Sequence, residues 1–179
     1  NYELPHGFPL GELIDGIGGG IANGRQLKAV IPGGSSTPIL TAAEARKVTL
    51  DFDSMTGAGT AIGSAAVIAL DDRVCMVQLA VRVSQFYEHE SCGKCTPCRV
   101  GTQIVAGLMD KLAANHGSPY DINELFKMHR LMQGASHCGL VNSACNALLD
   151  TLNKFKPAYE RRLKSLDFEP AFDLDALDR

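Results

Sequence analysis

The chain has 179 residues, of which 45% are hydrophobic and 21% are charged, and its formal net charge is −3. Nucleic acid is excluded as the main partner because phosphate binding needs a concentrated positive face. The apolar runs are too short for direct membrane insertion. The chain opens with Asn1 rather than Met and carries no secretory signal pattern, so we expect a piece of a longer protein.

The first 72 residues are rich in Gly, Pro, Ser and Thr between short apolar runs. Leu10 to Ile17 predicts a short helix with its apolar residues on one face. Lys28–Ile31 predicts a strand that stops at a Pro-Gly-Gly turn, and Ala66–Leu70 predicts a buried strand that stops at two aspartates. Short strands around one helix indicate a small α+β domain over residues 1–72.

The pattern becomes helical after this domain. Val74 to Tyr87 is apolar nearly all round, as in a helix buried between neighbours, and Asp71 or Asp72 can cap it. The second predicted helix runs from about Pro97 to Asn115, with Thr96 as its N-cap and the proline at its first position.

Two further helices are predicted downstream. The third starts at Asp121, where Glu124 completes a capping-box pattern, and the fourth follows Cys138 and is kinked or ended by Pro157. The stripe of the third is Ile122, Leu125, Phe126, His129 and Met132, and that of the fourth is Val141, Cys145, Leu148, Leu149, Leu152 and Phe155. The fold class is therefore α+β, with a four-helix bundle over residues 73–165. The acidic tail, 166–179, is expected to be loosely held.

Cysteine usage carries the strongest chemical indication. The six cysteines are Cys75, Cys92, Cys95, Cys98, Cys138 and Cys145. Three of them fall within seven residues, and no secretory context accompanies them. This favours metal chemistry in a reducing, cytoplasmic compartment over disulfides.

The motif Cys92-Gly93-Lys94-Cys95-Thr96-Pro97-Cys98 can supply three corners of a [4Fe–4S] cluster from one loop, with a fourth thiolate from elsewhere. Gly93 allows the loop to bend with a positive φ. Structural zinc usually takes two ligand pairs, and no second pair is obvious. Zinc nevertheless stays open, because His89 and His137 lie near cysteines in the sequence.

The fourth ligand is Cys138 or Cys145. Cys138 lies in a loop-like turn before a helix, whereas Cys145 lies on the apolar stripe, about 10 Å further along the helix axis. Because free cysteine is among the most buried residue types, we expect Cys145 and Cys75 in the core. The motif leads into a helix N-terminus, and Lys94 and Arg99 add positive charge nearby, so each should raise the cluster's reduction potential.

Catalytic motifs are missing from the sequence. Gly57 to Gly63 has the spacing GxGxxxG, but a predicted strand follows where a dinucleotide fingerprint needs a helix. No Walker loop, nucleophile elbow or HExxH motif is present. We therefore predict no catalytic residue in this chain.

Two segments carry a family resemblance. Glu90–Arg99, followed some forty residues later by Cys138-Gly139-Leu140, resembles the flavoprotein subunit of NADH dehydrogenases. That family includes the NADH-binding subunit of respiratory complex I and the diaphorase subunits of NAD-dependent formate dehydrogenases and NAD-reducing hydrogenases. Leu27–Ser36 resembles the β-grasp ligand-binding domain of the same subunits. The match covers about residues 1–163.

The resemblance implies an electron relay. In that family NADH reduces FMN, and a [4Fe–4S] cluster passes single electrons from FMN to Fe–S centres of a partner subunit. The family's ligands map to Cys92, Cys95, Cys98 and Cys138. The FMN and NADH domain lies upstream of these segments, so this chain alone should not oxidise NADH. The resemblance places it in the cytoplasm, or at the cytoplasmic or matrix face of a membrane complex.

The chain departs from the family after the distal cysteine. Val141 follows Gly-Leu, and Ala144-Cys145-Asn146 stands where proline is common. The His137-Cys138-Gly139-Leu140 turn also departs from complex I, which slightly favours a soluble NAD-dependent formate dehydrogenase or hydrogenase. Two other functions stay open: a structural module with zinc or an inert cluster that serves subunit interaction, and an interaction domain whose β-grasp half binds a partner or soluble ligand.

Overall fold

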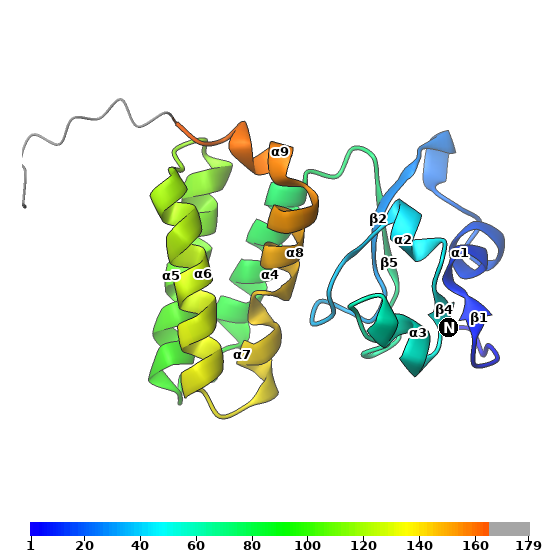
Figure 1. Cartoon of the computed structure of the whole chain (residues 1–179), viewed down its shortest axis with the longest axis horizontal. Helices are drawn as coiled ribbons and strands as arrows, with labels where there is room; N and C mark the ends of the chain where they lie inside the picture. The colour runs from blue at the N-terminus through cyan, green and yellow to red at the C-terminus, as the bar shows by residue number, and fades with distance from the viewer. Residues whose placement is uncertain (165–179) are drawn as a thin grey trace, which may run out of the picture.

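Two units lie side by side in the computed structural model, which describes residues 1–164 (Figure 1). The sheet unit runs from β1 (Phe8–Pro9) to β5 (Ile68–Asp71), and the bundle runs from α4 (Met76–Glu90) to α9 (Lys156–Glu160). The α+β class is confirmed, with a small sheet region first and the helices second. The expected acidic tail, 166–179, lies outside the described residues.

The central strand of the sheet unit is β2 (Leu27–Ile31), close to the predicted position. It pairs antiparallel with β3 (Leu40–Thr41) on one side and β5 on the other. The strand predicted at Ala66–Leu70 is present in part, but the prediction that it is buried is wrong apart from Leu70. β5 begins two residues later and forms the edge of the sheet, so Ile68 is 43% exposed. A separate ladder joins β1 to β4 (Thr49–Leu50).

Short helices cover these sheets. The predicted helix at Leu10 to Ile17 consists of α1 (Leu10–Glu12) and a wider π turn, η1 (Leu13–Ile17), and only Leu10 and Ile14 are buried. Between the strands lie η2 (Ala22–Gly24), α2 (Ala42–Ala45) and α3 (Phe52–Gly57). The core of the unit comprises Leu10, Ile14, Val30, Leu40, Ala45, Val48 and Met55.

Four helical columns form the bundle, as predicted (Figure 1). The fourth column is broken at Cys145, where α7 gives way to α8. Pro157 lies in the first turn of α9, just after α8 ends. After α4, the helices are α5 (Thr96–Ala113), α6 (Pro119–Ala135), α7 (Gly139–Ala144), α8 (Asn146–Lys154) and α9.

The first two bundle helices are capped differently from the prediction. Cys75, not Asp71 or Asp72, is the N-cap of α4, because Asp71 is the last residue of β5 and lies too early in the chain. Cys95 is the N-cap of α5, which places Thr96 at the first helical position. Neither cysteine makes a side-chain capping hydrogen bond.

The third helix begins earlier than predicted. Ser118 is its N-cap, and Asp121 is the acidic partner in the capping box, the role predicted for Glu124. The carboxylate of Asp121 accepts hydrogen bonds from the Ser118 backbone N–H and from Lys111. The type of cap was predicted correctly, but it lies about one turn earlier in the chain.

Helix α4 is apolar nearly all round because it lies between the bundle core and the sheet unit. Val77 and Val81 pack into the bundle core, while Met76 and Val83 pack against β2 of the sheet unit. The prediction of a helix buried between neighbours is therefore confirmed.

A polar contact between α8 and the sheet unit reinforces this packing. Asn146 donates to the backbone oxygen of Ser36 at 2.8 Å. Asp150 accepts from the backbone N–H of Ile39 at 2.7 Å, and Lys154 donates to the Ile39 oxygen at 2.7 Å. These three residues, spaced four apart on one helix face, form what we call the α8 clamp.

Candidate metal centre

The two cysteine-bearing loops lie at the same end of the bundle. The α4–α5 loop carries Cys92, and the α6–α7 loop carries Cys138. Because α4, α5 and α6 run antiparallel in turn, both loops fall at the end opposite α9 (Figure 1). Sequence positions more than forty residues apart are thus brought to one end of the bundle.

The first loop is closed by its own hydrogen bonds. Gly93 has a φ of +76°, as its role in the bend predicted. Its backbone N–H donates to Ser91 Oγ at 3.4 Å, and its oxygen accepts from Arg99 Nη1 at 2.8 Å. Ser91 Oγ also lies 3.4 Å from Cys98 Sγ. The loop geometry is therefore set by groups on both sides of the motif.

The four candidate ligands differ in burial. Cys98 is buried, Cys95 is half-buried, and Cys92 and Cys138 are exposed. Cys138 is the N-cap of α7 and, like Cys95, makes no side-chain capping hydrogen bond. Their thiol groups are therefore not committed to capping the helices that follow them.

Within residues 1–164, no three histidine, cysteine, aspartate or glutamate side chains are gathered tightly enough to hold a metal ion. The structure thus brings the four cysteines to one end without collecting their sulfur atoms, and the ligand set stays a prediction. The donor set fits an iron–sulfur cluster, because four thiols are available there. The buried hydroxyl of Ser136, in the second loop, has no partner within the described chain.

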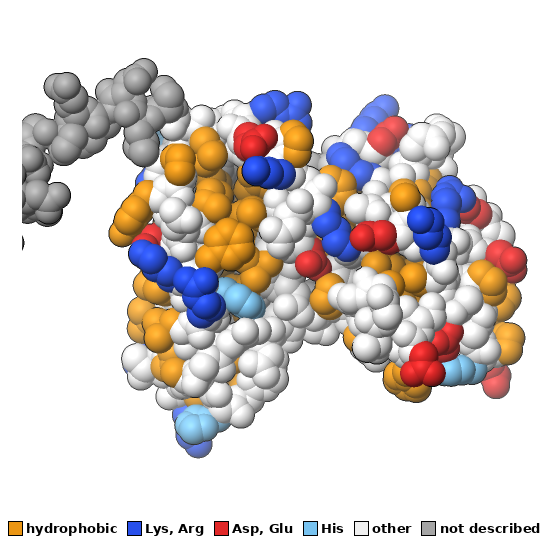
Figure 2. Space-filling view, viewed as in Figure 1, with side chains coloured by type: hydrophobic (Ala, Val, Ile, Leu, Met, Phe, Trp, Pro, Cys, Tyr) orange, Lys and Arg blue, Asp and Glu red, His pale blue; other side chains and the backbone are white. Residues whose placement is uncertain are grey.

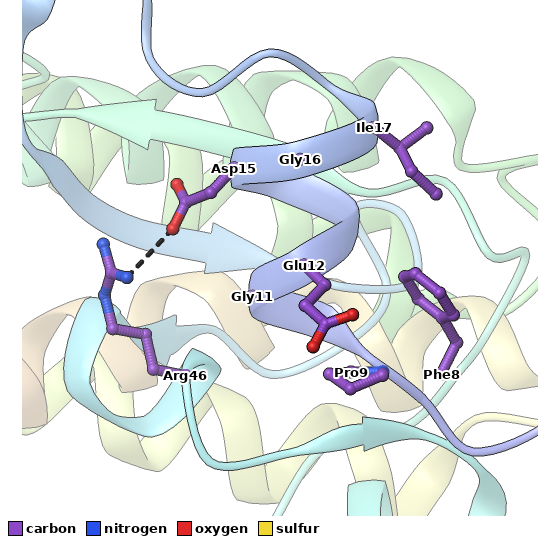
Figure 3. Close-up of a pocket in the computed structure, with 8 residues that line it drawn as sticks. All are labelled: Phe8, Pro9, Gly11, Glu12, Asp15, Gly16, Ile17 and Arg46. Atoms are coloured by element: carbon purple, nitrogen blue, oxygen red, sulfur yellow. Dashed lines mark hydrogen bonds and ion pairs between the residues drawn. The ribbon is translucent and has the colours of Figure 1, made fainter.

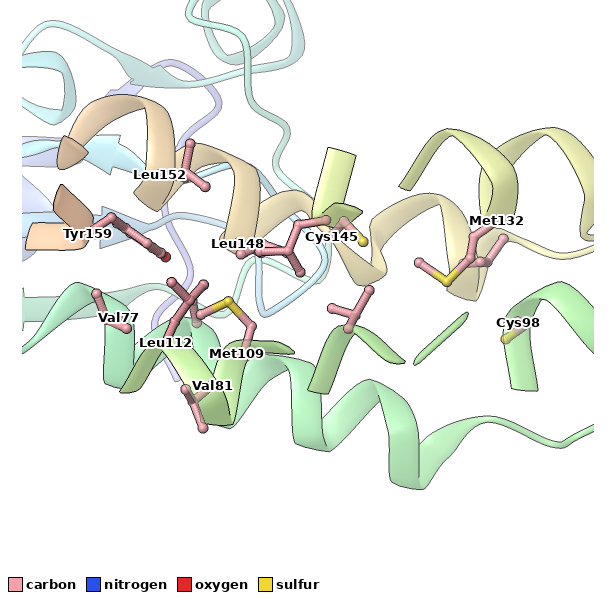
Figure 4. Packing of buried hydrophobic residues seen from close by; sticks show 14 residues of the cluster. Val77, Val81, Cys98, Met109, Leu112, Met132, Cys145, Leu148, Leu152 and Tyr159 are labelled. Carbon is pink, nitrogen blue, oxygen red and sulfur yellow. The ribbon is translucent and has the colours of Figure 1, made fainter. Parts of the chain in front are cut away.

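The placement of Cys145 in the core is confirmed. Its side chain is fully buried beside Leu148 in the bundle core (Figure 4). Burial raises the pKa of its thiol to about 12, so it remains protonated at neutral pH. A protonated thiol is a poor metal ligand, since the thiolate is the ligating form.

The placement of Cys75 in the core is confirmed only in part, because its side chain packs against the bundle core without being enclosed by it. It is half-buried at the start of α4, and its Sγ accepts a hydrogen bond from Arg162 at 3.3 Å. Burial raises the pKa of this thiol, but the nearby backbone N–H groups of Gln78 and Val77 and the Arg162 guanidinium outweigh burial and lower the pKa overall. It lies at the opposite end of the bundle from the motif.

The remaining candidate residues are exposed. Arg99 donates to the Gly93 oxygen, which holds its guanidinium against the first loop. Lys94, His89 and His137 are exposed around the same end. The influence of Lys94 and Arg99 on a cluster, and the zinc alternative with its histidines, therefore stay predictions.

Sequence reasoning missed two residues that shape this end. Ser91 contacts the Cys98 sulfur, and its only sequence indication is its place next to the motif. Gly101 lies where α5 meets α6: a Cβ there would stand 2.5 Å from Met132 Sδ. The close approach of these helices beside Cys98 (Figure 4) therefore depends on glycine.

Away from the cysteines, the sheet unit carries pockets, the larger of which, about 920 Å³, lies beside Leu50 and Val67. A pocket of about 580 Å³ lies in the sheet unit beside α1 (Figure 3). Its Arg46 and Asp15 pair with each other at 2.9 Å. On the face shown in Figure 2, basic side chains are interspersed with acidic and apolar ones. Among the described helices, none is both long and apolar enough to cross a membrane.

Comparison with known proteins accounts for the cysteine-bearing end. Residues 78–162, which include all four candidate ligands, match the family model described as the NADH-ubiquinone oxidoreductase-F iron-sulfur binding region. Residues 78–162 belong to this iron–sulfur binding family. The expected resemblance to the C-terminal region of an NADH-binding flavoprotein subunit is confirmed, and with it a 4Fe-4S binding region.

Curated relatives extend the match over most of the chain. The second NADH-quinone oxidoreductase F-subunit of Rhizobium meliloti is 42% identical over 158 residues, which cover 88% of this chain and 37% of the relative. The corresponding F-subunit of Streptomyces coelicolor is 37% identical over 180 residues, which cover 99% of this chain and 40% of the relative. The chain thus spans about two fifths of the length of these relatives.

A solved structure has the same fold. A chain in the crystal structure of an NAD⁺-reducing [NiFe]-hydrogenase in the H2-reduced state superposes with a TM-score of 0.81 and 34% identity. The match covers 98% of this chain and 29% of the hydrogenase chain. The arrangement of sheet unit and bundle therefore occurs within a larger redox protein.

Proposed function

We propose that this chain is the one-electron relay of an NADH-dependent flavoprotein subunit. Cys92, Cys95, Cys98 and Cys138 would hold one [4Fe–4S] cluster. When bound, it would supply the one-electron step between FMN bound outside these residues and Fe–S centres of a partner subunit. The observation that carries the proposal is the position of both cysteine-bearing loops at one end of the bundle, inside the matched iron–sulfur binding region.

The chain's own residues have definite tasks in this proposal. The cluster supplies reversible one-electron chemistry when bound. Cys95 would hold it against the N-terminal end of α5, an 18-residue helix whose positive dipole end favours the negative charge of thiolates. The Arg99 guanidinium, held by the Gly93 oxygen, adds positive charge at the same place. Both the helix end and the guanidinium favour the more negative, reduced state.

The identity of the parent complex is part of this proposal, and the relatives support it. The curated relatives are named as subunits of NADH-quinone oxidoreductase, and the solved relative is an NAD⁺-reducing hydrogenase. In either setting the FMN and NAD(H) sites lie in the part of the parent protein that this chain does not cover. We place the parent protein peripherally, at the cytoplasmic or matrix face.

Anaerobic reconstitution of the full chain tests the relay. A broad absorbance band near about 400 nm that bleaches with dithionite is the expected result for a cysteine-ligated [4Fe–4S] cluster. Elemental analysis should find iron rather than zinc. A colourless protein that takes up one zinc ion would contradict the relay and support the structural metal module.

A further inference from the structure

Among the described residues, Ser91 is the polar side chain that hydrogen-bonds a candidate ligand sulfur. It is the C-cap residue of α4, and its Oγ lies 3.4 Å from Cys98 Sγ. Cys98 is the buried member of the motif and Ser91 is half-buried, so the contact at the Cys98 sulfur is partly shielded from water. A shielded hydrogen bond is stronger than one exposed to solvent.

The direction of this hydrogen bond follows from the thiolate state of a ligand cysteine, and a second contact agrees with it. The backbone N–H of Gly93 points to Ser91 Oγ at 3.4 Å, and a backbone N–H can only donate. The serine oxygen is therefore the acceptor there, which leaves its own hydrogen for another partner. Among the described residues, the partner within reach is the Cys98 sulfur, which as a thiolate can only accept.

We infer that Ser91 donates a hydrogen bond to the ligand sulfur of Cys98 and thereby raises the reduction potential of the cluster. The inference rests on the proposed function, because it requires Cys98 to be a ligand. Reduction adds negative charge that spreads onto the ligand sulfurs, so a donor there stabilises the reduced state more than the oxidised one. Hydrogen bonds to cluster sulfurs are among the factors that set such potentials.

The loop itself orients the serine for this role. Gly93, with its φ of +76°, turns the backbone so that its N–H faces Ser91. Arg99 holds the Gly93 oxygen at 2.8 Å from the other side. The backbone therefore holds the Ser91 oxygen beside the Cys98 sulfur.

The test compares Ser91→Ala with Ser143→Ala in the reconstituted full chain. Ser143 lies at the same end of the bundle, but its hydroxyl bonds the Gly139 oxygen of its own helix. Iron content is measured first, and the midpoint potential is then measured by titration with EPR detection. We expect Ser91→Ala to keep its iron and to lower the equilibrium constant for reduction about tenfold, which is about 59 mV for one electron. Ser143→Ala should leave the potential unchanged.

The outcomes separate the two proposals. Full iron with an unchanged potential in Ser91→Ala would overturn the inference and leave the relay standing. A wild-type chain that binds no iron would overturn the relay itself. If Ser91→Ala loses iron, Ser91→Thr and Ser91→Val are compared instead. These two side chains have the same shape, but only threonine keeps the hydroxyl that can donate to the Cys98 sulfur. A lower potential in the valine variant supports the hydrogen bond, and equal potentials contradict it.

Discussion

The carboxylate of Asp150 in α8 accepts a hydrogen bond at 2.7 Å from the backbone N–H of Ile39, across the boundary between the bundle and the sheet unit. Lys154 donates to the oxygen of the same residue at 2.7 Å and to Glu44 at 2.9 Å. The α8 clamp thus satisfies both backbone groups of a fully buried residue, as a neighbouring strand would.

Removing the acceptor should destabilise the chain. Asp150→Ala leaves the buried N–H of Ile39 without a partner, and we expect a loss of about 1–3 kcal/mol in the free energy of unfolding. Urea denaturation measures this loss. Asn153→Ala, an exposed position on the same helix, is the matched control and should change stability by less than about 0.5 kcal/mol. Equal effects at the two positions would show that the clamp adds no stability of its own.

The same carboxylate should make stability depend on pH. Burial raises the pKa of Asp150 above its ordinary 3.8, although the Ile39 N–H and Lys154 act in the opposite direction. The folded state therefore binds the proton more tightly than the unfolded state. This contribution to stability is complete below pH 3.8 and is lost as the pH rises through the folded pKa. Asparagine does not titrate, so Asp150→Asn does not lose stability in this way. The melting temperature of Asp150→Asn should therefore rise relative to that of the wild type as the pH increases above 3.8. A constant difference would contradict the raised pKa.

Asp121 predicts the opposite pH dependence. Burial acts to raise its pKa, but hydrogen bonds from Lys111 and Ser118 outweigh burial and lower it below 3.8. Its contribution to stability is present above pH 3.8 and is lost as the pH falls through the folded pKa. Asp121→Asn should therefore melt below the wild type at neutral pH, with the gap closing in acid. Melting curves from about pH 2 to about pH 7 measure both variants together, and a gap that widens in acid would refute this assignment.

Two glycines on α5 should respond in opposite ways to alanine. Gly101→Ala places a Cβ 2.5 Å from Met132 Sδ, and overpacking of this kind costs about 1–3 kcal/mol. A methyl group at Gly107 would meet no atom within 4 Å, so Gly107→Ala should stabilise the helix by about 0.5–1 kcal/mol. Chemical denaturation measures the free energy of unfolding of both variants. Stabilisation by both substitutions would show that α5 and α6 have room to separate.

Local sequence patterns predicted much of this fold. The helical stripe that holds Cys145 is periodic, so its burial could be inferred from the sequence alone. The turn at Gly93 could be inferred because a loop that presents three cysteines must bend sharply. The cysteine spacing likewise indicated the iron–sulfur region, since spacing is a local property of the chain.

The errors concern the environment of each element, which local patterns do not contain. The exposure of Ile68 depends on whether a further strand or helix covers the edge of the sheet. Cys75 lies at a helix start and only borders the bundle core, so its apolar neighbours in sequence led to an overestimate of its burial. The clamp between Asp150 and Ile39 joins residues 111 positions apart, a distance over which no spacing rule applies.

The ligand set is tested most directly by the iron content of two cysteine variants after anaerobic reconstitution. We predict about four iron atoms per wild-type chain and an unchanged content in Cys145→Ala, whose thiol lies in the bundle core. We predict loss of the intact cluster in Cys138→Ala. Alanine avoids placing an unpaired hydroxyl in the core. Full iron in Cys138→Ala together with loss in Cys145→Ala would contradict the assignment of the fourth ligand.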